Sequence, residues 1–231
     1  MKIAIFFDQN NSVGGGFQQS ISDAKRFISL FSQEHEIFFY CDKKIKQKLL
    51  NYFDKNSNLI FINYKYNTLS KIFDLICYQA KTSVLISPFI RKIFKSTKFE
   101  NLFKKNSIDL VYFLSPNIHA RYLQLTLFFI TVWDNCSRLY PELPEVRKDY
   151  RYELVENTIK TTLQKSSAIF VDSKFTLSNI SKYYGIDKRK ILVSGLNPSP
   201  DLSLEKIDFK KNLNKKNYIC YPAQYWSHKN H

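Results

Sequence analysis

The chain has 231 residues, of which 35 are Lys or Arg and 20 are Asp or Glu, so its formal net charge is +15. Apolar residues make up 44% of the sequence and aromatic residues 16%. This composition excludes a disordered tail or a low-complexity linker, because the chain holds ample material for a hydrophobic core. The length allows one large domain, or one domain and part of another. No stretch of the sequence approaches the ~20 consecutive apolar residues of a membrane-spanning helix.

Targeting and cysteine patterns favour a cytoplasmic protein. The apolar run at residues 2–7 is short and leads directly into Asp8 without a small-residue cleavage site, which does not fit a secretory signal peptide. The four cysteines are scattered and show neither CxxC nor zinc-site spacing. We therefore expect reduced thiols, no metal site and a cytoplasmic location, with possible peripheral attachment to the inner face of a membrane.

Short β-branched or aromatic runs alternate with helical patterns along the chain, which is typical of an α/β protein with a parallel sheet. The predicted strands are residues 2–7, 36–40, 59–63, 109–114, 127–133, 168–172 and 191–194. The predicted helices are residues 17–31 and 44–53, two or three helices within 68–105, one long helix over 146–165, and 174–184. Gly185 is expected to end the last helix in a left-handed conformation. The sequence thus predicts a Rossmann-like parallel sheet flanked by helices.

The character of the sequence changes near residue 200. Pro198 and Pro200 precede a run rich in Lys and Asn, which predicts an interdomain linker over residues 201–217. A new strand is predicted at 218–221, and a strand with the opening of a helix cannot bury itself. We expect residues 1–200 to form the first domain and residues 218–231 to be the truncated start of a second one.

The positive charge is locally concentrated. From Lys81 to Lys105 there are seven basic residues and one acidic residue, Glu100, with apolar residues such as Phe99 and Phe103 between them. A basic amphipathic segment of this kind could lie on an anionic membrane surface. The alternative is the solvated face of ordinary surface helices. The sequence contains no recognised nucleic-acid-binding motif, so a nucleic-acid partner is not expected.

Three consecutive glycines, Gly14, Gly15 and Gly16, follow the first predicted strand and open the first helix. Glycines at this place allow a ligand to approach the backbone, and a helix N-terminus offers N–H groups to a phosphate. A dinucleotide fingerprint requires a glycine where Gln19 stands, so the fingerprint fails, although Asp42 could imitate its ribose-binding acid. A purely structural turn is the other alternative.

Polar residues also follow two later strands. Asp134 comes after the strand at 127–133, at the sheet edge where open α/β folds bind ligands. It could orient sugar hydroxyls or a neighbouring general base, or it could cap a helix or turn. Ser173 follows the strand at 168–172 and could bind a phosphate, but capping the helix from Lys174 is favoured.

Four segments, in this order, resemble glycosyltransferase family 4. They are the glycine triplet, VWDNCSRLYPELPEVR at 132–147, IFVDSKFTLSNISKYYGI at 169–186, and YPAQYWSHKNH at 221–231, the last being similar to mannosyltransferase members. The resemblance implies a GT-B enzyme with two Rossmann-like domains facing a cleft. The first domain would take the acceptor and the second a nucleotide-sugar. Transfer would retain the anomeric configuration and would need no metal or cofactor besides the nucleotide-sugar co-substrate.

The resemblance also implies roles for individual residues. Gly14, Gly15 and Gly16 match the loop that approaches the donor diphosphate and sugar, and Asp134 matches the acid of the central block. Lys229 matches a lysine that steadies the diphosphate, and Gln224 falls near an arginine of many relatives; Ser173 is a further candidate donor contact.

The chain departs from the family pattern in two ways. Relatives commonly carry a histidine in the central block, where this chain has Trp133 and Ser137. His119 could be a polar sugar contact, or else a loop histidine whose hydrogen bonds are already satisfied. The family's donor site, with its paired glutamates, lies in the C-terminal domain, of which this sequence holds only the beginning.

These observations together predict a retaining hexosyl- or mannosyltransferase that acts in cell-surface polysaccharide or glycolipid synthesis. Its substrates would be a nucleotide-sugar and a sugar or lipid-linked sugar acceptor. We expect the chain by itself not to catalyse glycosyl transfer, because most of the donor domain is missing from the sequence. The alternative is a non-catalytic basic module or partner subunit that contacts anionic lipid or nucleic acid.

Overall fold

The computed structural model describes residues 1–8, 14–53, 59–83, 96–198, 221, 223 and 225–229. Within these residues the chain forms one seven-stranded sheet, with the order β3-β2-β1-β4-β5-β6-β7. Every strand pair is parallel. The strands are β1 (Lys2–Phe7), β2 (Glu36–Cys41), β3 (Ile60–Asn63), β4 (Leu110–Phe113), β5 (Leu127–Val132), β6 (Ala168–Val171) and β7 (Ile191–Val193). The predicted Rossmann-like α/β fold is confirmed.

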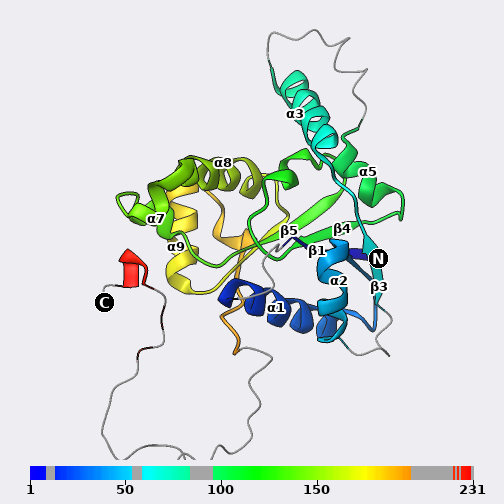
Figure 1. Cartoon of the computed structure of the whole chain (residues 1–231), viewed down its shortest axis with the longest axis horizontal. Coiled ribbons are helices and arrows are strands. Elements are labelled where there is room, and N and C mark those ends of the chain that lie inside the picture. Colours follow the sequence, from blue (N-terminus) through cyan, green and yellow to red (C-terminus); the bar gives the residue numbers. More distant parts are fainter. Residues whose placement is uncertain are drawn as a thin grey trace, which may run out of the picture.

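Helices cover both faces of the sheet (Figure 1). Side chains of α1 (Gly15–Phe31) and α2 (Lys43–Leu50) pack on one face, together with Ile3, Ile5 and Phe7 of β1. Side chains of α5 (Lys98–Lys104), α8 (Arg151–Leu163) and α9 (Lys174–Tyr184) join Ala4 and Phe6 in the core on the other face. Because β1 is buried on both faces, its sequence is a continuous apolar run rather than an alternating one.

The predicted long helix over residues 146–165 is wrong. The structure has α7 (Pro144–Arg147), a 3₁₀ turn η2 (Lys148–Tyr150) and then α8. Asp149 and Tyr150 have φ of 57° and 56°, and two successive left-handed residues cannot continue a right-handed helix. The sequence analysis also missed the short helix α6 (Cys136–Leu139). Gly185, with φ of 65°, ends α9 as expected.

Part of the predicted amphipathic segment from Lys81 to Lys105 is also wrong. Phe99 and Phe103 of α5 are fully buried in the core, so they cannot contact a membrane surface. Residues 84–95 of that segment, the linker at 201–217 and most of the predicted strand at 218–221 lie outside the described residues. Among the helices that the structure describes, none is long and apolar enough to cross a membrane.

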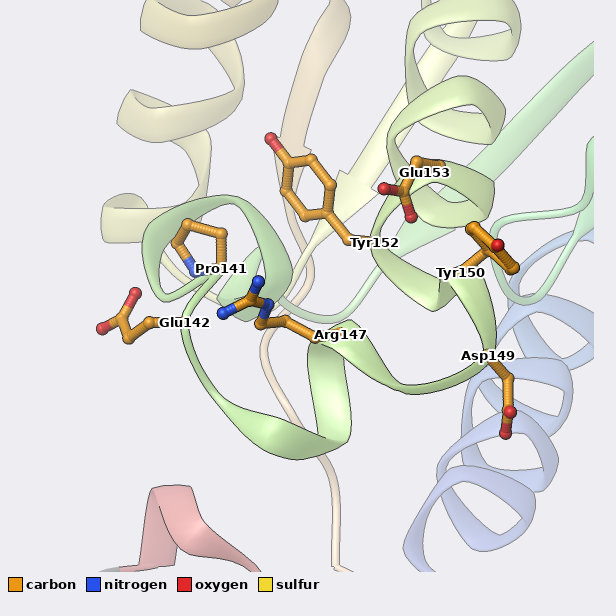
Figure 2. Close-up of a pocket in the computed structure, with 7 residues that line it drawn as sticks. All are labelled: Pro141, Glu142, Arg147, Asp149, Tyr150, Tyr152 and Glu153. Atoms are coloured by element: carbon orange, nitrogen blue, oxygen red, sulfur yellow. The ribbon is translucent and has the colours of Figure 1, made fainter.

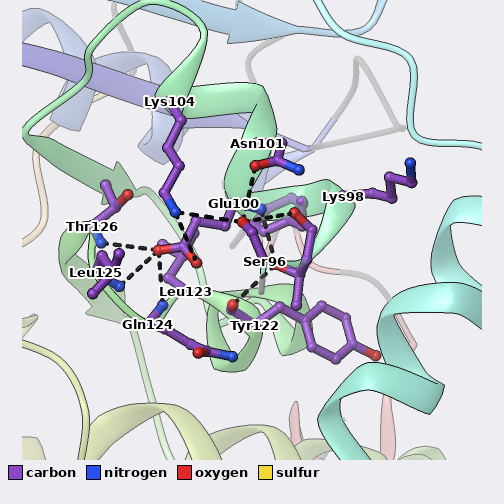
Figure 3. Close-up of polar contacts among 12 residues, drawn as sticks. Ser96, Lys98, Glu100, Asn101, Lys104, Tyr122, Leu123, Gln124, Leu125 and Thr126 are labelled. Carbon is purple, nitrogen blue, oxygen red and sulfur yellow. Dashed lines mark hydrogen bonds and ion pairs between the residues drawn. The ribbon is translucent and has the colours of Figure 1, made fainter. Parts of the chain in front are cut away.

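A buried carboxylate joins α5 to the beginning of β5 (Figure 3). The Glu100 side chain is 1% exposed, and its Oε1 accepts backbone N–H bonds from Gln124, Leu125 and Thr126 at 3.1, 2.7 and 3.2 Å. Lys104 Nζ lies 3.9 Å from Oε2. These contacts offset the cost of removing a charged group from water, and they fix the chain just before β5.

We predict that Glu100→Ala lowers the free energy of unfolding by about 2 kcal/mol, because it leaves one buried and two half-buried N–H groups without an acceptor. Urea unfolding measures this change. The matched control is Glu34→Ala, which removes an exposed carboxylate and should stay within about 0.5 kcal/mol of the wild type. Equal stability of the two variants would contradict the role assigned to Glu100.

Candidate functional site

The strand order defines the edge of the sheet where a ligand is expected. After β1 the chain adds β2 and β3 on one side of β1, and it then adds β4 on the other side. After β1 the next strand, β2, lies on one side of this pair, and after β4 the next strand, β5, lies on the other side, which makes the carboxyl ends of β1 and β4 a topological switch point. Open α/β folds bind their ligands at such a topological switch point.

A cavity of about 740 Å³ lies at this position, and we call it the switch-point pocket. Its polar lining includes Asp8 after β1, Asp42 after β2, Tyr64 and Tyr66 after β3, and His119 after β4. Its volume falls within the range of about 300–1,000 Å³ that is usual for small-molecule sites. The pocket thus collects side chains from the carboxyl ends of four neighbouring strands.

Asp8 lies at the switch point, between the ends of β1 and β4. Its carboxylate accepts hydrogen bonds from Ser115 Oγ, at 3.3 Å, and from Asn117 Nδ2. Burial raises the pKa of Asp8 above its ordinary value, and the two hydrogen bonds oppose that rise. A half-buried carboxylate held in this way is a strong acceptor for ligand hydroxyl groups.

His119 stands beside the pocket among aromatic rings. Its ring lies 5.0 Å from that of Tyr66 and 5.6 Å from that of Phe99, measured between centroids. Burial, with smaller effects from the charges of Lys71 and Arg121, lowers its pKa to about 4, so the imidazole is neutral at neutral pH. Among the described residues, the structure shows no hydrogen bond to its buried Nδ1, and the choice between a sugar contact and a satisfied loop histidine stays a prediction.

Two tyrosines add apolar surface to the polar lining. The Tyr64 ring packs 4.9 Å from Phe6, and the Tyr66 hydroxyl donates to Asp74 Oδ2 at 2.9 Å, which fixes its ring. Aromatic faces pack well against the C–H faces of sugar rings, while carboxylate and imidazole groups bind hydroxyls. The lining of the switch-point pocket therefore suits a polyhydroxylated ligand.

A second cavity, of about 520 Å³, adjoins the first, because Pro116 and Val155 line both. It brings together two residues that the sequence analysis singled out, Asp134 and Lys229. Asp134 Oδ1 accepts from the backbone N–H of Cys136 at 2.9 Å, so it closes a turn before α6, whose N-cap residue is Asn135. The catalytic role of Asp134 remains a prediction.

Cys136 lies in the second cavity as well, and its protonation state bears on what the cavity can do. Burial, followed by the negative charges of Asp134, Glu145 and Glu142, raises the pKa of the Cys136 thiol, while Lys229 opposes the rise. The thiol therefore stays protonated at neutral pH and is not an activated nucleophile.

The remaining predicted donor residues are not gathered at either cavity. Gly14 has φ of 102° and precedes α1, which begins at Gly15, and no heavy atom lies within 4 Å of a Cβ placed on Gly14 or Gly15. In the described part of the chain, Gly14, Gly15 and Gly16 line neither cavity. Gln224 lies outside the described residues.

Ser173 and Trp133 have structural contacts. Ser173 Oγ accepts from the backbone N–H of Thr176 at 3.2 Å, so it caps α9, as favoured from the sequence. Trp133, which replaces a histidine common in the resembling family, donates its indole N–H to Asp23 Oδ2 of α1 at 3.4 Å. This hydrogen bond ties the end of β5 to the helix that the glycine triplet opens.

A third cavity, of about 620 Å³, lies at the turn between α6 and α8 (Figure 2). It includes the left-handed residues Asp149 and Tyr150. Figure 2 shows that the Glu142 and Asp149 carboxylates point away from each other and that neither points toward Arg147. We therefore assign no site there. Among the described residues, no group of three or more His, Cys, Asp or Glu side chains is placed to hold a metal ion.

No protein-family model and no curated protein matches this chain. The resemblance to glycosyltransferase family 4 accordingly rests on the four sequence segments alone.

Sequence reasoning missed the switch-point pocket as a whole. Asp42 and His119 were considered singly, while Tyr64, Tyr66 and Asn117 were not considered. One signal was present: Asp8 directly follows a buried strand, as Asp134 does. Asp8 becomes part of a pocket because β4 lies next to β1, and no local sequence pattern predicts that pairing.

We predict a specific effect of His119 on stability between about pH 4 and 6.5. In the unfolded chain this histidine gains a proton as the pH falls through 6.5, whereas in the folded chain it stays neutral down to about pH 4. Acidification over this range therefore favours the unfolded state. His119→Gln lacks this titratable group, so its free energy of unfolding should fall by about 1 kcal/mol less than that of the wild type over this pH range. The expected difference is modest because solvent partly screens the half-buried ring.

Urea unfolding of both proteins at several pH values measures the difference, and an NMR titration reports the pKa of His119 directly. The raised pKa of Asp8 contributes with the opposite sign, but it is present in both proteins and cancels in the comparison. An ordinary pKa for His119, or equal losses in the two proteins, would contradict the burial described above.

Proposed function

We propose that this chain is the acceptor-binding, N-terminal part of a retaining, nucleotide-sugar-dependent glycosyltransferase of the hexosyl or mannosyl type. The observation that carries the proposal is the switch-point pocket, whose carboxylate, neutral imidazole and tyrosine rings match the chemistry of a sugar. The four sequence segments that resemble glycosyltransferase family 4 point to the same class of enzyme. The pathway we favour is cell-surface polysaccharide or glycolipid synthesis.

Each group in the pocket has a distinct role in binding the acceptor. Asp8 accepts hydrogen bonds from acceptor hydroxyls and so orients one of them. Neutral His119 contributes hydrogen-bonding capacity without a charge, and the Tyr64 and Tyr66 rings pack on the sugar. Lys65 and Lys71 also line the pocket and provide positive charge for a phosphate on a lipid-linked acceptor.

The adjoining cavity provides a place for the donor. Lys229 would steady the diphosphate of the nucleotide-sugar, and Asp134 would contact the transferred sugar. Because Pro116 and Val155 line both cavities, a donor there would lie next to an acceptor in the switch-point pocket. Holding the two substrates side by side supplies much of the advantage of an enzyme in a group-transfer reaction.

We predict that a saccharide acceptor raises the melting temperature of the purified chain and that Asp8→Asn largely abolishes this rise. A ligand at ten times its dissociation constant stabilises the folded state by about 1.4 kcal/mol. Loss of a charged hydrogen-bond acceptor should weaken binding about tenfold or more. Thermal melts with a panel of mono- and disaccharides, free and lipid-linked, measure both effects.

Asp187→Asn is the matched control, because this carboxylate is exposed beside β7, at the end of the sheet farthest from β3. It should keep the full shift. If no saccharide shifts the wild type, while a polyanion does so in a salt-sensitive way, the chain is a basic binding module and the proposed function is wrong.

A further inference from the structure

The helix α3 (Thr68–Thr82) extends away from the sheet, with α5 near its base (Figure 1). Four aliphatic side chains of α3 are between 42% and 76% exposed, namely Leu69, Ile72, Leu75 and Ile76. Their spacing of three and four residues places them on one side of the helix. We call these four residues the α3 face. Three other residues of the helix, Asp74, Cys77 and Ala80, are buried against the protein.

The acidic residues of this region are removed from the surface. Asp74 is fully buried, and its carboxylate accepts backbone N–H bonds from Lys98 and Phe99 at 2.5 and 2.7 Å. It also accepts the hydroxyl of Tyr66. Glu100 is buried in the same manner at the beginning of β5 (Figure 3). Both carboxylates are thus held by backbone N–H groups inside the protein.

The exposed charges that remain are all positive. From residue 64 to residue 108, the described part of the chain contains two acidic residues, and both are the buried ones just named. The exposed charged side chains of the same part are lysines: Lys65, Lys71, Lys98, Lys104 and Lys105. Two of these lysines are tied to α3 itself: Lys71 belongs to the helix, and Lys98 Nζ lies 5.3 Å from the centroid of the Phe73 ring of α3. The α3 face is therefore accompanied by positive charge, and no acidic side chain of residues 64–83 and 96–108 is exposed.

We infer that the α3 face docks on the surface of an anionic phospholipid bilayer. Aliphatic side chains of an interfacial helix insert at the boundary of headgroups and acyl chains, while flanking lysines pair with lipid phosphates. A nucleic acid would match the lysines but would leave four aliphatic side chains exposed to water. A second copy of this chain would bring two cationic surfaces together, which is electrostatically unfavourable.

This docking also orients the switch-point pocket. Lys71 belongs to α3 and lines the pocket, and Tyr66 and Asn67 lead from the pocket into the helix. A bilayer against the α3 face therefore lies close to the pocket mouth, where a lipid-linked ligand could reach it. The membrane docking itself stands on the α3 surface and does not depend on the proposed function.

The test is co-sedimentation of the full chain with vesicles of phosphatidylcholine alone and with vesicles that also contain phosphatidylglycerol. We expect binding only to the anionic vesicles, weakening as salt is added. The triple variant Leu69→Ser, Ile72→Ser, Ile76→Ser should lower the partition coefficient at least about tenfold. Lys98→Gln should lower it about fivefold.

Matched controls carry equivalent changes elsewhere. Leu30→Ser and Phe175→Ser remove exposed apolar side chains from α1 and α9, and Lys43→Gln and Lys44→Gln remove exposed charges from α2. All four should bind like the wild type, and circular dichroism confirms that every variant is folded. Equal binding of the triple variant and the controls overturns the inference. It is also overturned if the α3 variants abolish dimerisation or nucleic-acid binding while the chain ignores anionic vesicles.

Discussion

The parallel pairing of β1 with β4 is the constraint on which the rest of the structure depends. This pair joins the two halves of the sheet, so the carboxyl ends of β1 and β4 form the topological switch point at which the pocket lies. Asp8 stands at the beginning of the loop after β1, and Ser115 and Asn117 of the loop after β4 donate to its carboxylate. These hydrogen bonds connect the ends of β1 and β4, and they hold the Asp8 carboxylate as a hydrogen-bond acceptor in the lining of the switch-point pocket.

Three carboxylates that are buried or half-buried connect separate elements of the fold. Asp8 links the ends of β1 and β4, Asp74 links α3 to the first turn of α5, and Glu100 links α5 to the beginning of β5. Each is stabilised by hydrogen bonds from the protein, which is what a desolvated carboxylate requires. The burial of Asp74 and Glu100 also affects the surface, because it leaves lysines as the exposed charged residues of the described region from residue 64 to residue 108.

The sequence predicted the strands well, since a parallel strand buried on both faces is a continuous apolar run. It could not predict the break at Asp149 and Tyr150, because a single Asp within a helical pattern does not specify a left-handed conformation and Tyr rarely adopts one. Nor could it tell that Phe99 and Phe103 face the core, since apolar residues at helical spacing fit a membrane surface equally well. The pocket needed the strand order, which places Asp8, Tyr64 and His119 together although they are far apart in the chain.

The most direct test of sugar binding at the switch point is an NMR titration of the isotopically labelled chain with a saccharide acceptor. We expect shifts in the Asn117 side-chain amide, the His119 ring and the backbone of Asp8, with smaller changes at Tyr64 and Tyr66. Shifts confined to Gly14, Gly15 and Gly16, or none in any of these residues at saturating saccharide, would contradict the assignment of the pocket.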